Sequence, residues 1–181
     1  MEYQKSMFED MLPCYYDLSV WSLLLFVGNR RPLRALIDNG KKRIGSLREI
    51  SEDTLEDIVG TDMMEVFFTT RKMLSRTPQD WICDIWGNCL SDRRGKIVMK
   101  KAEGRTYTEI ADEEGLSRQR ITQIVSKFFA GQEPFLKIIE ENLKGTPDYD
   151  DELSKVFPDA TFRSIYRTWI ATQNRKKGLP L

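Results

Sequence analysis

The sequence predicts an all-α protein made of small helical bundles. Apolar residues recur at helical spacing through most of the 181-residue chain, whereas the strict alternation typical of strands is rare. Asn39-Gly40, a dipeptide that often marks a β-hairpin, follows a helical segment here and joins no alternating runs. Because 40% of the residues are apolar, the chain can form a hydrophobic core.

Breaks containing proline or glycine interrupt this helical pattern. Ser75–Pro78 separates an N-terminal unit from the middle of the chain, and Gly131–Pro134 closes the middle unit. A further break at Gly145–Pro147 precedes a last helical pair. The units expected from these breaks are 1–76, 77–131 and 132–181.

The N-terminal unit consists of short segments with apolar residues at inward-facing positions. The residues expected in its core are Leu36, Ile44, Leu47, Ile50, Leu55, Ile58, Val66 and Phe67. This pattern predicts a compact bundle of the helix-hairpin-helix kind. The span 29–74, through its steps IGSL and SEDTLEDIVG, resembles the C-terminal domain of the bacterial RNA polymerase alpha subunit.

That resemblance implies a DNA-contacting surface, which this chain alters. Arg31 matches the family's principal minor-groove arginine, whereas Arg34 stands where the family has asparagine. The family's phosphate-binding Gly-Lys-Lys-Ser segment is replaced by Asp-Met-Met-Glu at 62–65. Because carboxylates repel phosphates, we expect this unit to bind protein through the acidic stretch 49–65 or the methionines. The alternatives are that the methionines belong to the core, and that the arginines make weak DNA contacts.

The middle unit carries the pattern of a helix-turn-helix. Thr106 and Glu109 have the spacing of a capping box at the start of a short helix. Gly115 supplies a turn that tolerates a positive φ, and Ser117 is a suitable cap for the next helix. In a helix-turn-helix the second helix enters the major groove with its N-terminal residues at the base edges, which is the position of Arg118.

The polar face of this second helix holds the candidate DNA contacts. Arg118 and Gln119 are expected at base edges, because arginine pairs with guanine and glutamine with adenine through two hydrogen bonds. Thr122 and Gln123 lie one turn further along the same face, and the cap Ser117 belongs to the same candidate set. The side chains expected at phosphates, which hold register without reading sequence, are Lys101, Arg105, Arg120 and Lys127. The alternative is a polar face that meets only water or protein.

The stretch IVMKKAEGRTYTEIADEEGLSRQRITQIVSKF resembles region four of bacterial primary-type sigma factors, which binds the −35 promoter element. The matches are the helix before GRT, the EIA step, the GLS turn and the S-R-x-R-I-x-Q-I run, within about residues 91–128. The resemblance implies contacts to bases and backbone from Arg118, Gln119, Thr122 and Gln123. The family usually has glutamate at position 119 and arginine at position 122. We therefore expect DNA binding, but not recognition of the usual −35 sequence.

The C-terminal extension has the outline of another helix pair, loosely similar to a second helix-turn-helix. Thr161 is a candidate cap for a last helix with a basic outer face, formed by Arg163, Arg167, Arg175, Lys176 and Lys177. A DNA-contacting arm and a packing helix with a solvated basic end both fit this pattern. Trp81, Trp86 and Trp169 are expected in the core.

Composition narrows the classes of function. The 28 basic and 28 acidic residues balance, which argues against a protein that coats nucleic acid by charge alone. Charge is arranged in blocks, with seven basic residues and one acid over 30–48 and seven acids and no base over 49–65. Such blocks suggest faces with separate partners or simply solvated helix faces.

With no histidine and three cysteines that are not closely paired, we expect no metal, no cofactor and a reduced, cytoplasmic protein. The longest apolar run, 20–27, is too short to cross a bilayer, so no membrane partner is expected.

These observations favour a sequence-specific regulator of transcription, of bacterial or phage type, that binds double-stranded DNA and contacts RNA polymerase core or a sigma factor. The alternative is an interaction protein that binds polymerase or a sigma factor with little DNA affinity of its own. An enzyme is not expected, because the chain lacks histidine, a glycine-rich phosphate loop and a nucleophile elbow. No heptad seam predicts a dimer, and the oligomeric state stays open.

Overall fold

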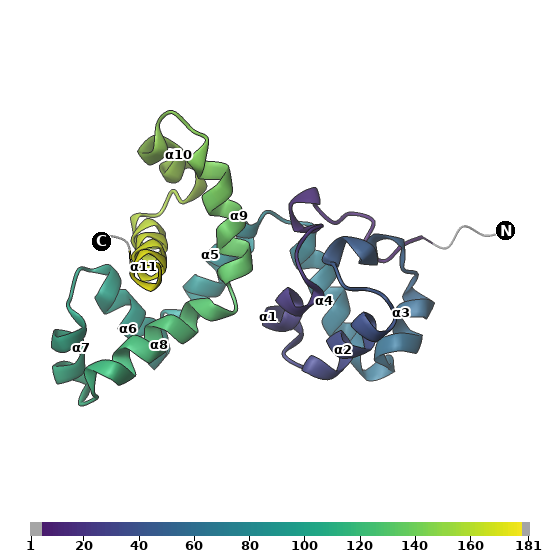
Figure 1. Ribbon diagram of the computed structural model, residues 1–181, viewed down its shortest axis with the longest axis horizontal. Helices are drawn as coiled ribbons and strands as arrows, with labels where there is room; N and C mark the ends of the chain where they lie inside the picture. The colour runs from purple at the N-terminus through teal and green to yellow at the C-terminus, as the bar shows by residue number, and fades with distance from the viewer. Residues whose placement is uncertain (1–4, 179–181) are drawn as a thin grey trace. The chain divides into compact units, whose positions relative to one another are not determined.

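The computed structural model describes residues 5–178 and is all-α, as the sequence predicts (Figure 1). Within these residues every helix is an α- or a 3-10 helix, and strand-like pairing is limited to two isolated bridges, Ser6–Ser51 and Ser19–Arg43. The chain forms two compact units, one reaching Trp81 and the other starting at Ile82.

The first unit is a bundle of short helices joined by tight connections. Its elements are η1 (Pro13–Tyr15), η2 (Val20–Leu23), α1 (Leu24–Val27), α2 (Arg30–Asp38), η3 (Ile44–Glu49), α3 (Glu52–Val59), η4 (Thr61–Met63), α4 (Met64–Leu74) and the start of α5 (Pro78–Cys89). Side-chain caps fix where the main helices begin. The Asn29 side chain accepts a hydrogen bond from the Arg31 amide at 2.9 Å, and the Ser51 hydroxyl accepts one from the Thr54 amide at 3.2 Å.

The core of the first unit contains most of the residues that the sequence placed there. Six of the eight are buried, namely Leu36, Ile44, Leu47, Ile50, Leu55 and Phe67. Ile58 and Val66 are half-buried instead, and Ile58 lines a surface pocket beside α2.

Trp81 lies in this core, as predicted, and its polar atom is hydrogen-bonded. The indole N–H donates to the Tyr15 hydroxyl at 2.9 Å, and that hydroxyl donates to the carbonyl of Arg76 at 2.5 Å. Burial raises the pKa of Tyr15 above its ordinary value, so the phenol stays protonated and keeps donating. These bonds satisfy two buried polar groups and join the N-terminal segment to the start of α5.

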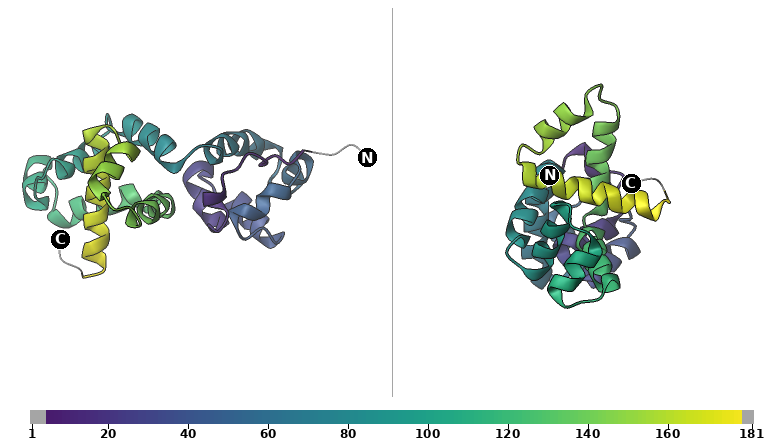
Figure 2. Two further views of the ribbon diagram at one scale, coloured as in Figure 1. Left: turned by 90° about the horizontal axis from the view of Figure 1, so that it is seen from above. Right: turned by 90° about the vertical axis from the view of Figure 1, so that its left-hand side faces the viewer.

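The second unit contains the rest of α5, followed by α6 (Arg93–Ala102), α7 (Tyr107–Glu114), α8 (Arg118–Ala130), α9 (Glu133–Lys144), α10 (Tyr149–Val156) and α11 (Ala160–Lys176). Helices α6, α7 and α8 pack on one another, and α11 packs against α6. The right-hand view of Figure 2 shows α11 along its length. Because α11 contacts α6, the boundary expected at residue 131 lies inside a single compact unit.

Trp86 and Trp169 are buried in this second core, as predicted. The Trp86 ring stacks on Phe157 with 5.5 Å between centroids, and its indole N–H donates to the Gln132 side-chain oxygen at 2.7 Å. The Gln132 amide nitrogen in turn donates to the carbonyl of Phe128 at 2.9 Å. This buried glutamine therefore ties the end of α8 to α5 with both ends of its side chain hydrogen-bonded.

The start of α6 lies close against the end of α5. The Asp92 side chain caps α6 by accepting from the Gly95 amide at 2.7 Å. A Cβ atom at position 95 would collide with the carbonyl of Cys89. Glycine is therefore required here for space, and the close approach sets the position of the helices that follow.

Candidate nucleic-acid interface

The first helix of the expected helix-turn-helix, α7, begins with a complete capping box. The Thr106 hydroxyl accepts from the Glu109 amide at 3.1 Å, and the Glu109 carboxylate accepts from the Thr106 amide at 2.8 Å. Each side chain satisfies a backbone donor that the helix itself leaves without a partner.

The turn between α7 and α8 depends on one left-handed residue. Gly115 has φ +65°, a conformation that a residue with a Cβ atom adopts only at a cost. Ser117 then begins α8, and its hydroxyl accepts from the Arg120 amide at 3.1 Å. The structure therefore gives Ser117 a capping role at the N-terminal end of α8.

Helix α8 has one apolar face and one polar face. The apolar face, buried against α6 and α7, consists of Ile121, Ile124, Val125 and Phe129. On the polar face Arg118, Gln119 and Gln123 are exposed, and Arg120 and Lys127 are exposed as well. Packing thus fixes α8 through its apolar face and leaves the predicted reading residues accessible.

Thr122 is the one predicted contact on α8 that is half-buried. Its hydroxyl donates to the carbonyl of Arg118 at 3.0 Å, four residues back along the same helix. With the hydroxyl engaged by the helix, the methyl group is what the side chain offers to a partner, and a thymine methyl is an apolar contact of that kind.

An ion-pair network joins α6 to the end of α7. Lys100 Nζ lies 2.9 Å from a Glu113 carboxylate oxygen and 2.7 Å from one of Glu114. These hydrogen bonds hold the pKa values of both glutamates below the ordinary value, and they raise the pKa of the lysine. Arg93 adds a longer contact to Glu114, with Nε 3.6 Å from the carboxylate.

Arg105, which the sequence placed at a phosphate, belongs to this network. Its guanidinium pairs with Glu113, with Nη1 2.7 Å from Oε2. By contrast, Lys101, Arg118, Arg120 and Lys127 form no ion pair with any residue in the described range 5–178. Lys101 donates a hydrogen bond to the carbonyl of Arg105 at 3.2 Å. Of these basic residues, Arg118, Arg120 and Lys127 are therefore the ones most available to an external anion.

The two arginines expected at a DNA surface in the first unit are both exposed on α2. Arg34 forms an i,i+4 ion pair with Asp38, with 3.8 Å between Nε and the carboxylate. Arg31 lines a pocket of about 250 Å³ together with Asp57, Asp62 and Met63. Two carboxylates beside this arginine make the surface less suited to phosphate than the resemblance implied.

The two methionines of the segment 62–65 differ in how deeply they are buried. Met64 is buried in the core at the start of α4, whereas Met63 is half-buried and lines the same pocket as Arg31. One of the two therefore serves packing, and the other contributes to a surface that a protein partner could cover.

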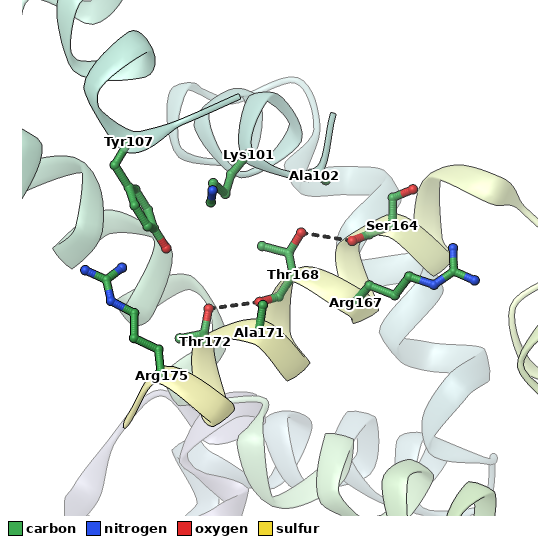
Figure 3. A pocket seen from close by; sticks show the side chains of 9 residues that line it. All are labelled: Lys101, Ala102, Tyr107, Ser164, Arg167, Thr168, Ala171, Thr172 and Arg175. Atoms are coloured by element: carbon green, nitrogen blue, oxygen red, sulfur yellow. Dashed lines mark hydrogen bonds between the residues drawn. The ribbon is translucent and has the colours of Figure 1, made fainter. Parts of the chain in front are cut away.

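Tyr107 was not singled out by the sequence, yet two cations lie over its ring. Lys101 Nζ is 4.6 Å from the ring centroid, and the Arg175 guanidinium carbon is 5.0 Å from it. Figure 3 shows the tyrosine between α6 and α11 with both basic side chains near it. No local pattern connects positions 107 and 175, because the contact depends on how α11 packs.

The residues that the structure describes hold no cluster of histidine, cysteine, aspartate or glutamate suited to a metal ion. None of the three cysteines, all within residues 5–178, forms a disulfide bond, and burial raises the pKa of Cys14 and of Cys89. No helix within residues 5–178 combines the length and the apolar character needed to cross a membrane. Comparison of the chain with protein-family models, curated proteins and solved structures finds no match.

Proposed function

We propose that this protein is a sequence-specific DNA-binding regulator of transcription, of bacterial or phage type, with α8 as its reading helix. The observation that carries the proposal is the division of α8 into a buried apolar face and an exposed face bearing Arg118, Gln119 and Gln123. The caps and the glycine turn support it, because two helices joined by a tight turn are the elements of a helix-turn-helix.

Each side chain on the exposed face has a distinct proposed role. Arg118 and Gln119, in the first turn, contact base edges, and Gln123 continues this surface one turn later. Arg120 and Lys127 contact phosphates and hold the helix in register. The resemblance to sigma region four supports these roles, and the substitutions at 119 and 122 favour a target other than the usual −35 element.

The first unit is the proposed contact to RNA polymerase core or a sigma factor. Glu52, Asp57 and Asp62 are exposed carboxylates on or next to α3, a surface that favours a basic protein partner over DNA. The same surface is the observation that favours a second candidate function, in which the chain binds polymerase or a sigma factor and has little DNA affinity of its own.

The deciding experiment is selection from a random duplex library at near-physiological salt, with and without core RNA polymerase. A motif enriched by the protein alone is the expected result and supports an autonomous regulator. Enrichment only when polymerase is present, or no enrichment, would replace the first proposal with the second.

Two variants on α8 refine this test. Lys127→Ala should weaken binding to every duplex and reduce the slope of log affinity against log salt by about 1. The matched control is Lys137→Ala on α9, where the lysine pairs with Glu133 at 3.3 Å and no DNA contact is proposed. If the two variants change DNA affinity and its salt dependence equally, α8 is not part of the DNA interface.

A further inference from the structure

A basic hollow lies between α6, the start of α7 and α11 (Figure 3). It has a volume of about 400 Å³, and the residues that line it include three cations, Lys101, Arg167 and Arg175, but no carboxylate. Of the three, Arg167 forms an ion pair, with 3.9 Å between Nη2 and the Asp150 carboxylate. The hydroxyls of Thr168 and Thr172 on the α11 side donate to carbonyls of their own helix at 2.9 Å each. The hollow therefore offers positive charge to a ligand, and these two donors are already engaged.

Tyr107 lines the part of the hollow that holds two of its basic side chains. Lys101 and Arg175 both lie over its ring, and neither forms an ion pair with any of residues 5–178. The electron-rich ring attracts each cation, and Figure 3 shows the ring lying between the two. Phosphate suits the arginine because the guanidinium can donate two parallel hydrogen bonds.

The hollow continues toward the start of α8. A second space of about 490 Å³ shares Lys101, Tyr107 and Arg175 with the first, and it extends to Thr108 and Arg118. Arg118 is the first residue of the proposed reading helix. The phosphates that border a major groove lie beside a helix inserted into it, so this position suits a backbone contact.

We propose that the hollow receives a phosphate of the DNA backbone, held by Arg175 beside Tyr107. Helix α11 is then part of the DNA interface, and the C-terminal extension acts as a clamp on the sugar-phosphate backbone next to the reading helix. This inference rests on the proposed function. The chemistry recognised is a phosphate group, and its source is taken to be duplex DNA.

The test compares two neighbouring charge-removing variants on α11. Arg175→Gln removes a cation that lines both spaces, whereas Lys176→Gln removes an exposed cation that lines neither. Arg175→Gln should weaken binding to all duplexes by the same factor, leave the preferred sequence unchanged and lower the salt slope by about 1. Lys176→Gln should leave the affinity close to that of the unmodified chain.

A second arm locates the phosphate. Single phosphates flanking the selected site are replaced one at a time by neutral methylphosphonates. Replacing the phosphate at one of these positions should weaken DNA binding by the unmodified chain and by Lys176→Gln. The same replacement should have no further effect on Arg175→Gln, because that variant has already lost the contact. If the two variants respond alike at every position, or Arg175→Gln binds as tightly as Lys176→Gln, the clamp is refuted.

A third arm separates DNA from free phosphate. The DNA source is refuted by two results together. Inorganic phosphate would raise the melting temperature of the unmodified chain but not that of Arg175→Gln, and no single methylphosphonate position would weaken DNA binding. The proposed function fails separately, because in that case the unmodified chain enriches no duplex at all. If the unmodified chain selects a preferred sequence but Arg175→Gln binds DNA with the same affinity, only the clamp proposal is overturned.

Discussion

Replacing Ser117 separates its structural role from its place at the proposed interface. The Ser117 hydroxyl caps α8 by accepting from the Arg120 amide at 3.1 Å, and the side chain is exposed. Ser117→Ala leaves that amide without its acceptor and should cost about 1 kcal/mol of stability. In a unit of this size the loss corresponds to a fall in melting temperature of roughly 4–8 °C.

Ser117→Asp gives the opposite pattern. Aspartate caps as well as serine, and its charge is favourable at the positive end of the helix by about 0.3–1 kcal/mol, so stability should be kept or slightly raised. The same carboxylate would face DNA phosphates, and a repulsion of about 1 kcal/mol, the Coulomb energy of two charges 4 Å apart in water, weakens binding several-fold for all sequences.

The assays are thermal unfolding followed by circular dichroism and fluorescence anisotropy with a labelled duplex at two salt concentrations. Ser117→Ala should lose stability and keep most of its DNA affinity below its melting temperature, and Ser117→Asp should keep stability and lose affinity. Two outcomes would refute the reasoning. If Ser117→Asp binds DNA as tightly as serine, the start of α8 does not lie at the DNA, and if Ser117→Ala is as stable as the unmodified chain, the cap contributes nothing.

Three further predictions test other parts of the molecule. Gln119→Glu should move the preferred base at one position from adenine toward cytosine and cost about 1–3 kcal/mol on the original site, as measured by repeating the library selection. Because the pKa values of Glu113 and Glu114 are lowered, their contribution to stability is complete above the ordinary glutamate value and is lost as the pH falls through the shifted values. Replacing both with glutamine should therefore flatten the acid side of the curve of stability against pH, and an unchanged curve would contradict the network. Gly95→Ala should destabilise the second unit by at least the roughly 1–3 kcal/mol of an overpacked core, because its Cβ meets backbone at the end of α5. Gly87→Ala, a helical site with nothing within 4 Å, should instead stabilise by about 1 kcal/mol and is the control in urea unfolding.

The sequence predicted the caps of α7 and α8 and the turn between them well, because the signals that set them are local. The capping box joins Thr106 to Glu109, the cap of α8 joins Ser117 to Arg120, and Gly115 forms the turn through its own backbone. Each signal involves residues within a few positions of one another, so it can be read without knowing the rest of the fold.

The environment of individual charges was less predictable. Arg105 and Lys101 look alike in the sequence, yet one pairs with Glu113 and the other lies over the Tyr107 ring. The two adjacent methionines also differ in their surroundings, because Met64 is buried in the core and Met63 lines a surface pocket. Neighbours in the chain can meet quite different surroundings, because a helix turns successive side chains to different sides.

The sequence by itself determined that the protein is all-α, that Thr106 and Ser117 cap α7 and α8, and which face of α8 is apolar. Its prediction of Thr161 as the cap of α11 was wrong, because Asp159 caps that helix by accepting from the Thr161 amide at 2.7 Å. Periodicity and capping depend on short-range geometry, which the order of residues specifies directly.

Only the tertiary structure decided that α11 packs on α6 and brings Arg175 to Tyr107, that Arg105 pairs with Glu113 of α7, and that the described residues from Ile82 onward form one unit. These features depend on contacts between segments far apart in the chain, where packing of the whole core selects one arrangement from many that the local sequence allows.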